Sequence, residues 1–225
     1  MKNTNASEEE YAKPSVTVDV LVFTILEDRL KVALVKRGVE PFKGRWALPG
    51  GFVHIDESLD EAARRELEEE AGICDVFLEQ LYTFGNVARD PRTRVITVAY
   101  YALVPGQRIN LVASTDAADA QWFSVDELPV LAFDHTEIMK TGLERLKSKL
   151  EYSNIAYGLL PARFRLSDLQ KVYEIISGRA IDKRNFRKKM LSLNIVEATK
   201  YVDASGAHRP AQLYRFKKRK TVFFS

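Results

Sequence analysis

The stretch from Gly51 to Ile73, GFVHIDESLDEAARRELEEEAGI, most constrains this chain, because a double glycine leads into an amphipathic segment rich in carboxylates. Ser58 and Glu61 have the spacing of a capping box, which predicts a helix that begins there and ends at Gly72. One face of this helix carries three carboxylates at positions i, i+3 and i+4, namely Glu66, Glu69 and Glu70. Like charges at this spacing repel, so the face requires a counter-charge.

A divalent cation is the counter-charge that we expect at this face. Mg²⁺ prefers oxygen ligands and usually keeps waters and substrate phosphate oxygens in its shell. The alternative is a solvated acidic helix face, which most runs of glutamate form. The complete spacing favours the metal site, since Gly51, Glu57, Arg65-Glu66-Leu67, Glu69-Glu70 and Gly72-Ile73 form one extended pattern.

This pattern resembles the signature of the Nudix family, whose members hydrolyse nucleoside diphosphates linked to another moiety. The resemblance implies an α/β Nudix sandwich, in which a mixed sheet lies between helices. It also implies Mg²⁺ or Mn²⁺ held by Glu66, Glu69 and Glu70 and by a glycine carbonyl of the preceding turn, for which we choose Gly51. The same three glutamates are the predicted catalytic residues, and Gly50 and Gly51 are predicted ligand contacts.

Many Nudix hydrolases take a further metal ligand or general base from a carboxylate that precedes a late strand bearing a tryptophan. Here Asp116 and Asp119 precede Trp122. We predict Asp116 as the additional catalytic residue, although both aspartates also suit a turn. If neither serves, Glu69 or Glu70 would activate water. Trp122 is expected in the core rather than against an adenine ring.

Length and composition describe a soluble globular protein. The chain has 225 residues, of which 46% are hydrophobic, enough for two domains with a sizeable core. No apolar run has the length of a membrane span and the N-terminus is polar and acidic, so we expect no membrane partner and a cytoplasmic location. The single cysteine, Cys74, cannot form an intrachain disulfide and is expected to be buried.

Hydrophobic patterning predicts three segments: a disordered tail at 1–14, a Nudix domain at 15–152 and a second domain at 153–225. Asp134-His135 is expected to precede the helix that closes the Nudix domain, with His135 in a structural role. The predicted strands of this domain are 15–26, 30–36, 46–48, 76–82, 95–104 and 118–123, and its closing helix covers 137–150.

The loop from Phe84 to Arg94 carries three arginines. Arginine binds phosphate or carboxylate with two parallel hydrogen bonds, but charges in such loops also occur as solvated turn residues. Together with LVKRGVEPFKGRWALPGGFV and LAFDH, the segment TFGNVARDPRTRVITVAYYAL resembles the ADP-ribose pyrophosphatase branch of the Nudix family and its regulator relatives. The resemblance makes Arg37, Arg89 and Arg92 candidate ligand contacts.

The C-terminal third is basic. Residues 1–150 hold 18 Lys and Arg against 25 Asp and Glu, a net charge of −7, whereas residues 151–225 hold 16 against 6, a net charge of +10. This asymmetry favours a polyanionic partner.

The local pattern of this third predicts a winged helix-turn-helix. A first helix is expected to be capped by Ser167 with Gln170 and to stop at Gly178, and a second helix to begin at Asp182. Two strand-like runs follow, at 195–202 and 211–216. In such a module the second helix enters the major groove of DNA and the hairpin forms the wing.

Basic residues of the second helix and the wing are the predicted DNA contacts. The alternative is a basic appendage that assists dimer formation without binding DNA. The segments RLSDLQKVYEIISGRAIDKRNFRKKMLSLNIV and RPAQLYRF, after a Nudix domain, resemble the Nudix-related transcriptional regulators of NAD metabolism. The predicted contacts are Lys183, Arg184, Arg187, Lys188 and the neighbouring Lys189 on the helix, with His208 and Arg209 on the wing.

The resemblance implies ADP-ribose or a related sugar nucleotide as ligand, a homodimer and a double-stranded DNA operator. Two functions stay open. The first is a ligand-responsive DNA-binding transcriptional regulator, and the second is primarily an ADP-ribose pyrophosphatase whose C-terminal domain is accessory. Some regulators have a degraded box, whereas this one is intact, so we expect Mg²⁺-dependent hydrolysis to be retained. The regulated pathway, NAD or sugar metabolism, does not follow from the sequence.

Overall fold

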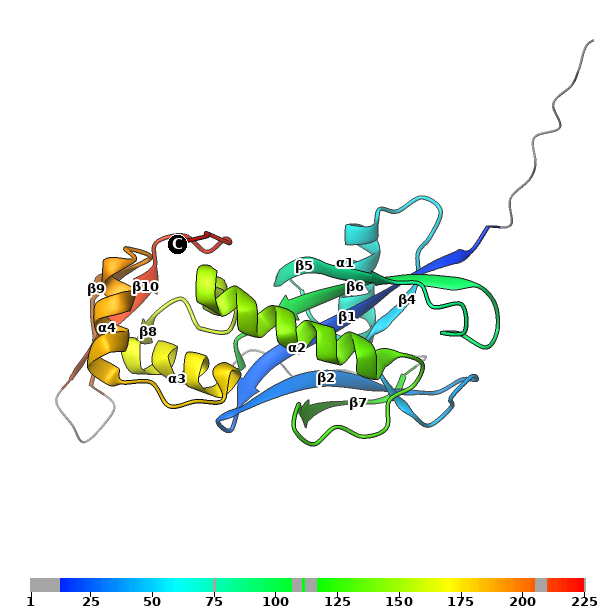
Figure 1. The fold of residues 1–225 in the computed structure, drawn as a ribbon, viewed down its shortest axis with the longest axis horizontal. Coiled ribbons are helices and arrows are strands. Elements are labelled where there is room, and N and C mark those ends of the chain that lie inside the picture. Colours follow the sequence, from blue (N-terminus) through cyan, green and yellow to red (C-terminus); the bar gives the residue numbers. More distant parts are fainter. Residues whose placement is uncertain (1–12, 75, 107–110, 112–116, 205–209, 225) are drawn as a thin grey trace, which may run out of the picture.

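The structure, a computed structural model, describes residues 13–74, 76–106, 111, 117–204 and 210–224. It has two halves arranged end to end, with the long helix α2 (His135–Tyr152) running along the first half towards the second (Figure 1). Most of the predicted tail, together with the predicted site residues Asp116, His208 and Arg209, lies outside the described residues.

Within the described residues, the first half holds a seven-stranded mixed sheet of order β3-β2-β1-β6-β5, with β4 on β1 and β7 on β2. β1 runs parallel to β6, and the other pairs are antiparallel. The predicted strands are confirmed, and β4 is an addition that pairs the double-glycine turn with β1. The strands are β1 (Ser15–Leu26), β2 (Arg29–Arg37), β3 (Trp46–Ala47), β4 (Gly50–Phe52), β5 (Phe77–Phe84), β6 (Val95–Leu103) and β7 (Ala117–Ser124).

Helices α1 (Leu59–Ala71) and α2 pack on opposite faces of this sheet, which confirms the predicted sandwich. Side chains of β1 point alternately to the two faces of the sheet, so the sheet separates two apolar clusters. Val20 and Val22 belong to the cluster that contains α1 residues, and Leu21 belongs to the cluster that contains α2 residues. The capping box of Ser58 with Glu61 is present, and Gly72 ends α1 with φ 66°.

Two local expectations for this half are corrected. α2 begins at His135, two residues before the predicted start, and the carboxylate of Asp134 makes no capping bond because it accepts from Arg89 instead. Cys74 is exposed rather than buried. Ile73, whose N–H donates to Leu67 O, occupies the apolar position after α1.

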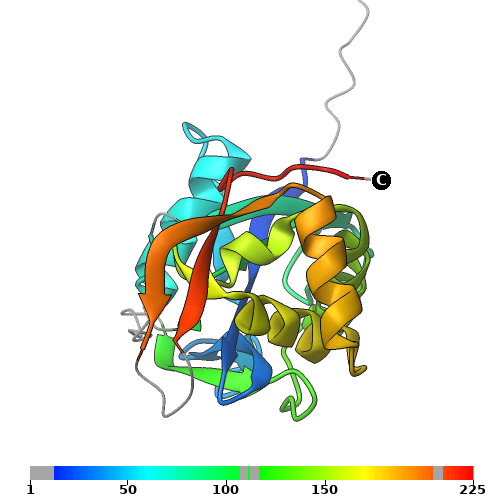
Figure 2. The same ribbon diagram turned by 90° about the vertical axis from the view of Figure 1, so that its left-hand side faces the viewer.

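The second half is a winged helix, as predicted. Among the described residues its sheet has the order β8-β10-β9, and Figure 2 shows α4 on one side of this half and the β9–β10 hairpin on the other. Asp182 caps α4 by accepting from Asn185 N–H. The elements are η2 (Ile155–Gly158), β8 (Phe164–Arg165), α3 (Leu166–Ser177), α4 (Lys183–Ser192), β9 (Val196–Asp203) and β10 (Ala211–Phe216).

The predicted capping box of Ser167 with Gln170 is wrong. The N-cap of α3 is Arg165, two residues before Ser167, and the Asp168 carboxylate accepts from Arg165 N–H. Gln170 donates its side-chain amide to Glu174 and to Ile181 O, so it holds the α3–α4 turn. No helix of the described ranges is long and apolar enough to cross a membrane.

One buried apolar cluster runs through both halves. It contains Leu21 and Leu146 from the first half, Tyr157 from the connection, and Leu169 and Phe186 from the winged helix. The rings of Phe77 and Phe216 lie 5.8 and 6.3 Å from that of Tyr157, so this residue packs against both sheets. The two halves therefore share a core.

Candidate ligand and metal site

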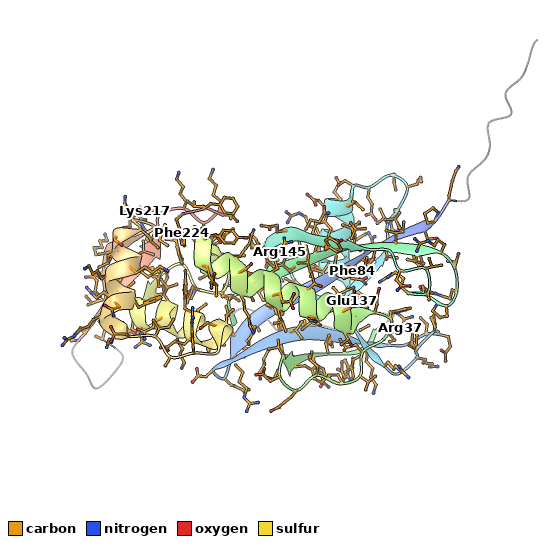
Figure 3. All side chains as sticks on the ribbon, viewed as in Figure 1. Arg37, Phe84, Glu137, Arg145, Lys217 and Phe224 are labelled. Atoms are coloured by element: carbon orange, nitrogen blue, oxygen red, sulfur yellow. The ribbon has the colours of Figure 1, made fainter. Side chains whose placement is uncertain are left out.

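A cavity of about 880 Å³ opens at the end of the first half that lies away from the winged helix. Arg37, labelled in Figure 3, marks this end of the molecule. The cavity brings together the predicted Nudix-site residues that the structure describes: Arg37, Gly50, Gly51, Glu66, Glu69, Glu70, Arg89 and Arg92.

The double glycine holds the acidic helix close to the sheet. Gly50 has φ 157°, and a Cβ there would lie 2.2 Å from Val18 O. A Cβ on Gly51 would lie 2.3 Å from Glu66 Oε1, and Gly50 N–H donates to Glu70 Oε2 at 2.9 Å. Side chains larger than hydrogen would therefore displace either the sheet or the carboxylates.

Arg65 organises the carboxylates of the acidic face. Its guanidinium donates to both oxygens of Glu57 at 2.6 and 3.0 Å, to Glu66 at 2.6 Å and to Glu69 at 3.2 Å. Hydrogen bonds from Arg65 lower the pKa of Glu57 to about 2. Burial raises the pKa of Glu66, despite the contact with Arg65. Burial likewise raises the pKa of Glu70 to about 7, and the nearby Glu66 carboxylate adds to this.

The donor set of this face suits a hard divalent cation. Glu66 and Glu70 are carboxylates at the cavity wall, and their pKa values are raised chiefly by burial, with a smaller contribution from neighbouring carboxylates. A bound cation would supply a counter-charge, and carboxylate oxygens are its preferred ligands. Among the described residues, no three His, Cys, Asp or Glu side chains are arranged as a metal-binding group. In this arrangement Arg65 forms ion pairs with Glu66 and Glu69.

Arg89 differs from Arg92 because its side chain is only 4% exposed, against 42%, and is shared by two aspartates. It is buried and donates to both oxygens of Asp134 at 2.9 and 2.8 Å and to Asp19 at 3.1 Å. Although burial opposes it, His135 and Arg89 lower the pKa of Asp19. His135 Nδ1 accepts from Leu48 N–H at 2.9 Å. Arg89 therefore ties its loop to β1 and to the start of α2.

Arg37 and Arg92 lie against aromatic rings in the cavity wall. Arg37 is 4.8 Å from the centroid of the Phe133 ring, and Arg92 is 5.9 Å from that ring and 5.5 Å from Phe52. Arg92 also donates to both oxygens of Asp90 at 3.0 and 2.7 Å. Phe133 adopts φ 51°, a strained conformation for an aromatic residue that is common at functional sites.

Phe52, Phe133 and Asp19 were not predicted as site residues. Phe133 lies inside LAFDH, one of the segments that resemble the family, so the sequence did point to this region. A single phenylalanine is, however, usually expected in the hydrophobic core. Asp19 had a stronger signal, since it is a carboxylate within the otherwise apolar run SVTVDVLVFTIL. A charge in a buried strand requires a partner, which here comes from distant segments.

We expect Gly51→Ala to lower the affinity for Mn²⁺ by about 10–100-fold, the usual range for changes to groups that orient metal ligands. The added Cβ would lie 2.3 Å from Glu66 Oε1, too close for two non-bonded atoms, and would displace that carboxylate. Isothermal titration with Mn²⁺ measures the change. Gly85→Ala is the control, because its Cβ would have nothing nearer than 3.8 Å. Equal affinities of the two variants would contradict the assignment.

The exposed side of α4 carries the basic residues predicted to contact DNA. Phe186 and Met190 are buried against the domain. Arg187 Nη2 donates to Tyr214 Oη at 3.2 Å, so Arg187 leans towards β10. The exposed residues are Lys183, Arg184, Arg187, Lys188 and Lys189.

The mixed sandwich with its glycine turn and glutamate helix defines a NUDIX-type domain, and it is joined to a winged helix. Comparison with known families agrees with both assignments. Residues 16–146 match the NUDIX domain, and residues 156–216 match the NrtR DNA-binding winged helix domain. The chain therefore belongs to the NUDIX family, in the group whose members carry an NrtR winged helix.

Individual relatives extend over nearly the whole chain. The ADPR responsive transcriptional repressor NtrR of Acinetobacter baylyi is 37% identical over 211 residues, which are 92% of this chain and 84% of the relative. Shewanella oneidensis NrtR, crystallised with a 27mer DNA, is 36% identical with a TM-score of 0.80, over 90% of this chain and 93% of its own. The NUDIX domain of that NrtR, crystallised with ADP ribose, is 37% identical with a TM-score of 0.56, over 63% and 94%.

Proposed function

We propose that this protein is a transcriptional regulator that binds operator DNA through α4 and the wing and responds to ADP-ribose, or a related sugar nucleotide, in its NUDIX cavity. The observation that carries the proposal is the presence, in one chain, of an arginine-lined cavity beside a carboxylate helix and of an exposed basic helix on a winged fold. The relatives crystallised with DNA and with ADP ribose support it.

The cavity offers distinct groups to the parts of such a ligand. Arg37 and Arg92 suit phosphate oxygens, because arginine forms bidentate bonds with phosphate. The backbone of Gly50 and Gly51 approaches the ligand without side-chain obstruction. We keep Arg89 among the ligand contacts because it lines the cavity, but its bonds to Asp19 and Asp134 assign it chiefly to positioning the wall.

We further propose that the protein retains pyrophosphohydrolase activity. Mg²⁺ or Mn²⁺ would be held by Glu66, Glu69, Glu70 and the Gly51 carbonyl, and when bound it would neutralise charge on the diphosphate and orient the attacking water. Arg65 holds the glutamate side chains in place, and Gly50 N–H fixes Glu70. Glu69, Glu70 and Asp116 are the candidates for accepting the proton from water. ADP-ribose would give AMP and ribose 5-phosphate.

We propose a homodimer, because a winged helix reads one half-site and paired winged helices read a palindromic operator. A protein that binds an operator shares a compartment with the genome, so the cytoplasm stays the proposed location. Analytical ultracentrifugation would test the dimer.

The proposed regulation predicts reciprocal coupling between the two ligands. If ADP-ribose releases the operator, it should weaken operator binding by about 5–150-fold, and the operator should weaken ADP-ribose binding by the same factor. Fluorescence anisotropy of labelled upstream DNA, with and without ADP-ribose, measures the first factor, and calorimetry measures the second. AMP is the control ligand, since it lacks the second phosphate and the terminal ribose.

Two results would contradict the regulator. If saturating ADP-ribose does not change the affinity for the operator, the two ligands are not coupled. Weak binding of the upstream DNA, no tighter than to unrelated DNA at physiological salt, would remove the operator. The second result would favour an ADP-ribose pyrophosphatase with an accessory C-terminal domain.

A further inference from the structure

The segment that follows β10, residues 217–222, forms a second basic surface, which we call the basic strap. Its sequence is KKRKTV, and Lys217, Lys218, Arg219 and Lys220 are all exposed. We propose that the basic strap binds the phosphate backbone of double-stranded DNA beside the surface formed by α4 and the wing. The proposal rests on DNA being the partner, but not on a particular operator or on the nucleotide ligand.

The basic strap is held in a defined path by a buried residue of the connection between the halves. Asn154, which is 1% exposed, donates its side-chain amide to Lys218 O at 3.2 Å and to Lys220 O at 3.1 Å. The same side chain accepts from Val222 N–H at 2.7 Å. These bonds fix the backbone while leaving the lysine side chains exposed, so the positive charges have a fixed location.

The side chains of the strap divide into an anchor and exposed charges. Arg219 is the anchor, because its guanidinium donates to Tyr157 O at 2.8 Å and to Leu160 O at 3.1 Å. Lys218 and Lys220 form no ion pair with any residue that the structure describes. Exposed ammonium groups without acidic partners are suited to phosphate, and their contacts add affinity without reading sequence.

The strap begins at the end of the predicted recognition helix. Lys217 N–H donates to Ile195 O at 3.0 Å, and its ammonium group donates to Asn194, two residues beyond α4. Figure 2 shows the strap crossing the upper edge of the face formed by α4 and the hairpin, and Figure 3 places Lys217 near the end of α4. The strap thus extends the basic surface beyond the helix and the wing.

The test compares the salt dependence of DNA binding for the full-length wild type and for the triple variant Lys217→Gln, Lys218→Gln, Lys220→Gln. The probe is a duplex of arbitrary sequence, so the result does not depend on the operator. The slope of log K against log[salt] is negative, and removing one lysine–phosphate interaction reduces its magnitude by about 0.9. We expect the slope of the triple variant to be smaller by about 2–3, with an unchanged ratio of operator to non-operator affinity.

A matched control separates this interaction from net charge. The triple variant Lys13→Gln, Lys43→Gln, Lys140→Gln removes the same charge from exposed positions of the first half, and we expect its slope to equal that of the wild type. Equal slopes for the strap variant and the wild type would overturn the inference. Loss of binding to phosphatidylserine vesicles, with DNA binding intact, would overturn it in favour of a membrane surface.

A second variant removes no charge. Asn154→Ala deletes the hydrogen bonds that fix the strap, so we expect a reduced slope although every lysine remains. Its melting curve establishes that the chain is folded. A folded Asn154→Ala protein with the wild-type slope would overturn the claim that the path of the strap is needed. If the proposed regulatory function is wrong, the protein will show no preference for the operator but will still bind duplex DNA of arbitrary sequence. That result can therefore be distinguished from failure of the strap proposal.

Discussion

Glu70→Gln should reduce the rate of AMP formation from ADP-ribose and Mg²⁺ by roughly 10²–10⁴-fold, the range for loss of a group that transfers a proton in the reaction. The substitution removes the negative charge that a cation would bind and the basic oxygen that a water would require. The amide oxygen of Gln can still accept from Gly50 N–H, as Glu70 does, so the turn should keep its shape. Measurement of released AMP by chromatography follows the reaction.

The control for this variant is Glu68→Gln on the same helix. Glu68 is exposed and does not line the cavity, so its loss should leave the rate within about twofold. If the wild type and Glu70→Gln form AMP at the same rate, the activity does not come from this helix. A wild type that forms no AMP would leave binding as the role of the cavity.

Arg184→Gln should weaken operator binding by about 1–3 kcal/mol, roughly 5–150-fold, if Arg184 reads a base edge in the major groove. Arg184 is exposed on α4, on the side away from the buried Phe186 and Met190. Loss of a base contact should also reduce the ratio of operator to non-operator affinity, whereas loss of a phosphate contact would reduce both equally. Anisotropy titrations on both duplexes at one salt concentration distinguish these cases.

Lys171→Gln is the matched control in the same domain. Lys171 is exposed on α3, and its ammonium group pairs with Asp28 in the turn between β1 and β2, so it faces the first half rather than the surface of α4. We expect its DNA affinity to stay close to that of the wild type. If Arg184→Gln binds the operator as tightly as Lys171→Gln, α4 is not the recognition helix.

The sequence predicted the parts of this fold that depend on neighbouring residues. The helix from Ser58 to Gly72 follows from a cap, a periodic apolar stripe and a terminal glycine, all within one segment. The strands follow from β-branched runs such as SVTVDVLVFTIL. The site glutamates were found for the same reason, because their spacing along one helix sets their common face.

Features that depend on distant contacts were not predicted. Arg89 reaches Asp134 and Asp19, which are 45 and 70 positions away, so its role in holding the wall could not be read from its loop. The start of α3 depended on whether Ser167 with Gln170 or Arg165 with Asp168 formed the cap, and the local spacing allowed both pairs. Cys74 was assigned to the core by residue type and apolar neighbours, whereas its side chain is exposed.

The apolar cluster shared by the two halves has a thermodynamic consequence for regulation. Tyr157 packs against Phe77 of the first sheet and Phe216 of the second, so unfolding of either half exposes apolar surface of the other. A ligand that binds the native state at 100 times its Kd adds about 2.7 kcal/mol to the free energy of unfolding. Because the cluster joins the halves in one cooperative unit, ADP-ribose in the cavity would also protect the winged helix from unfolding, although it touches no residue there.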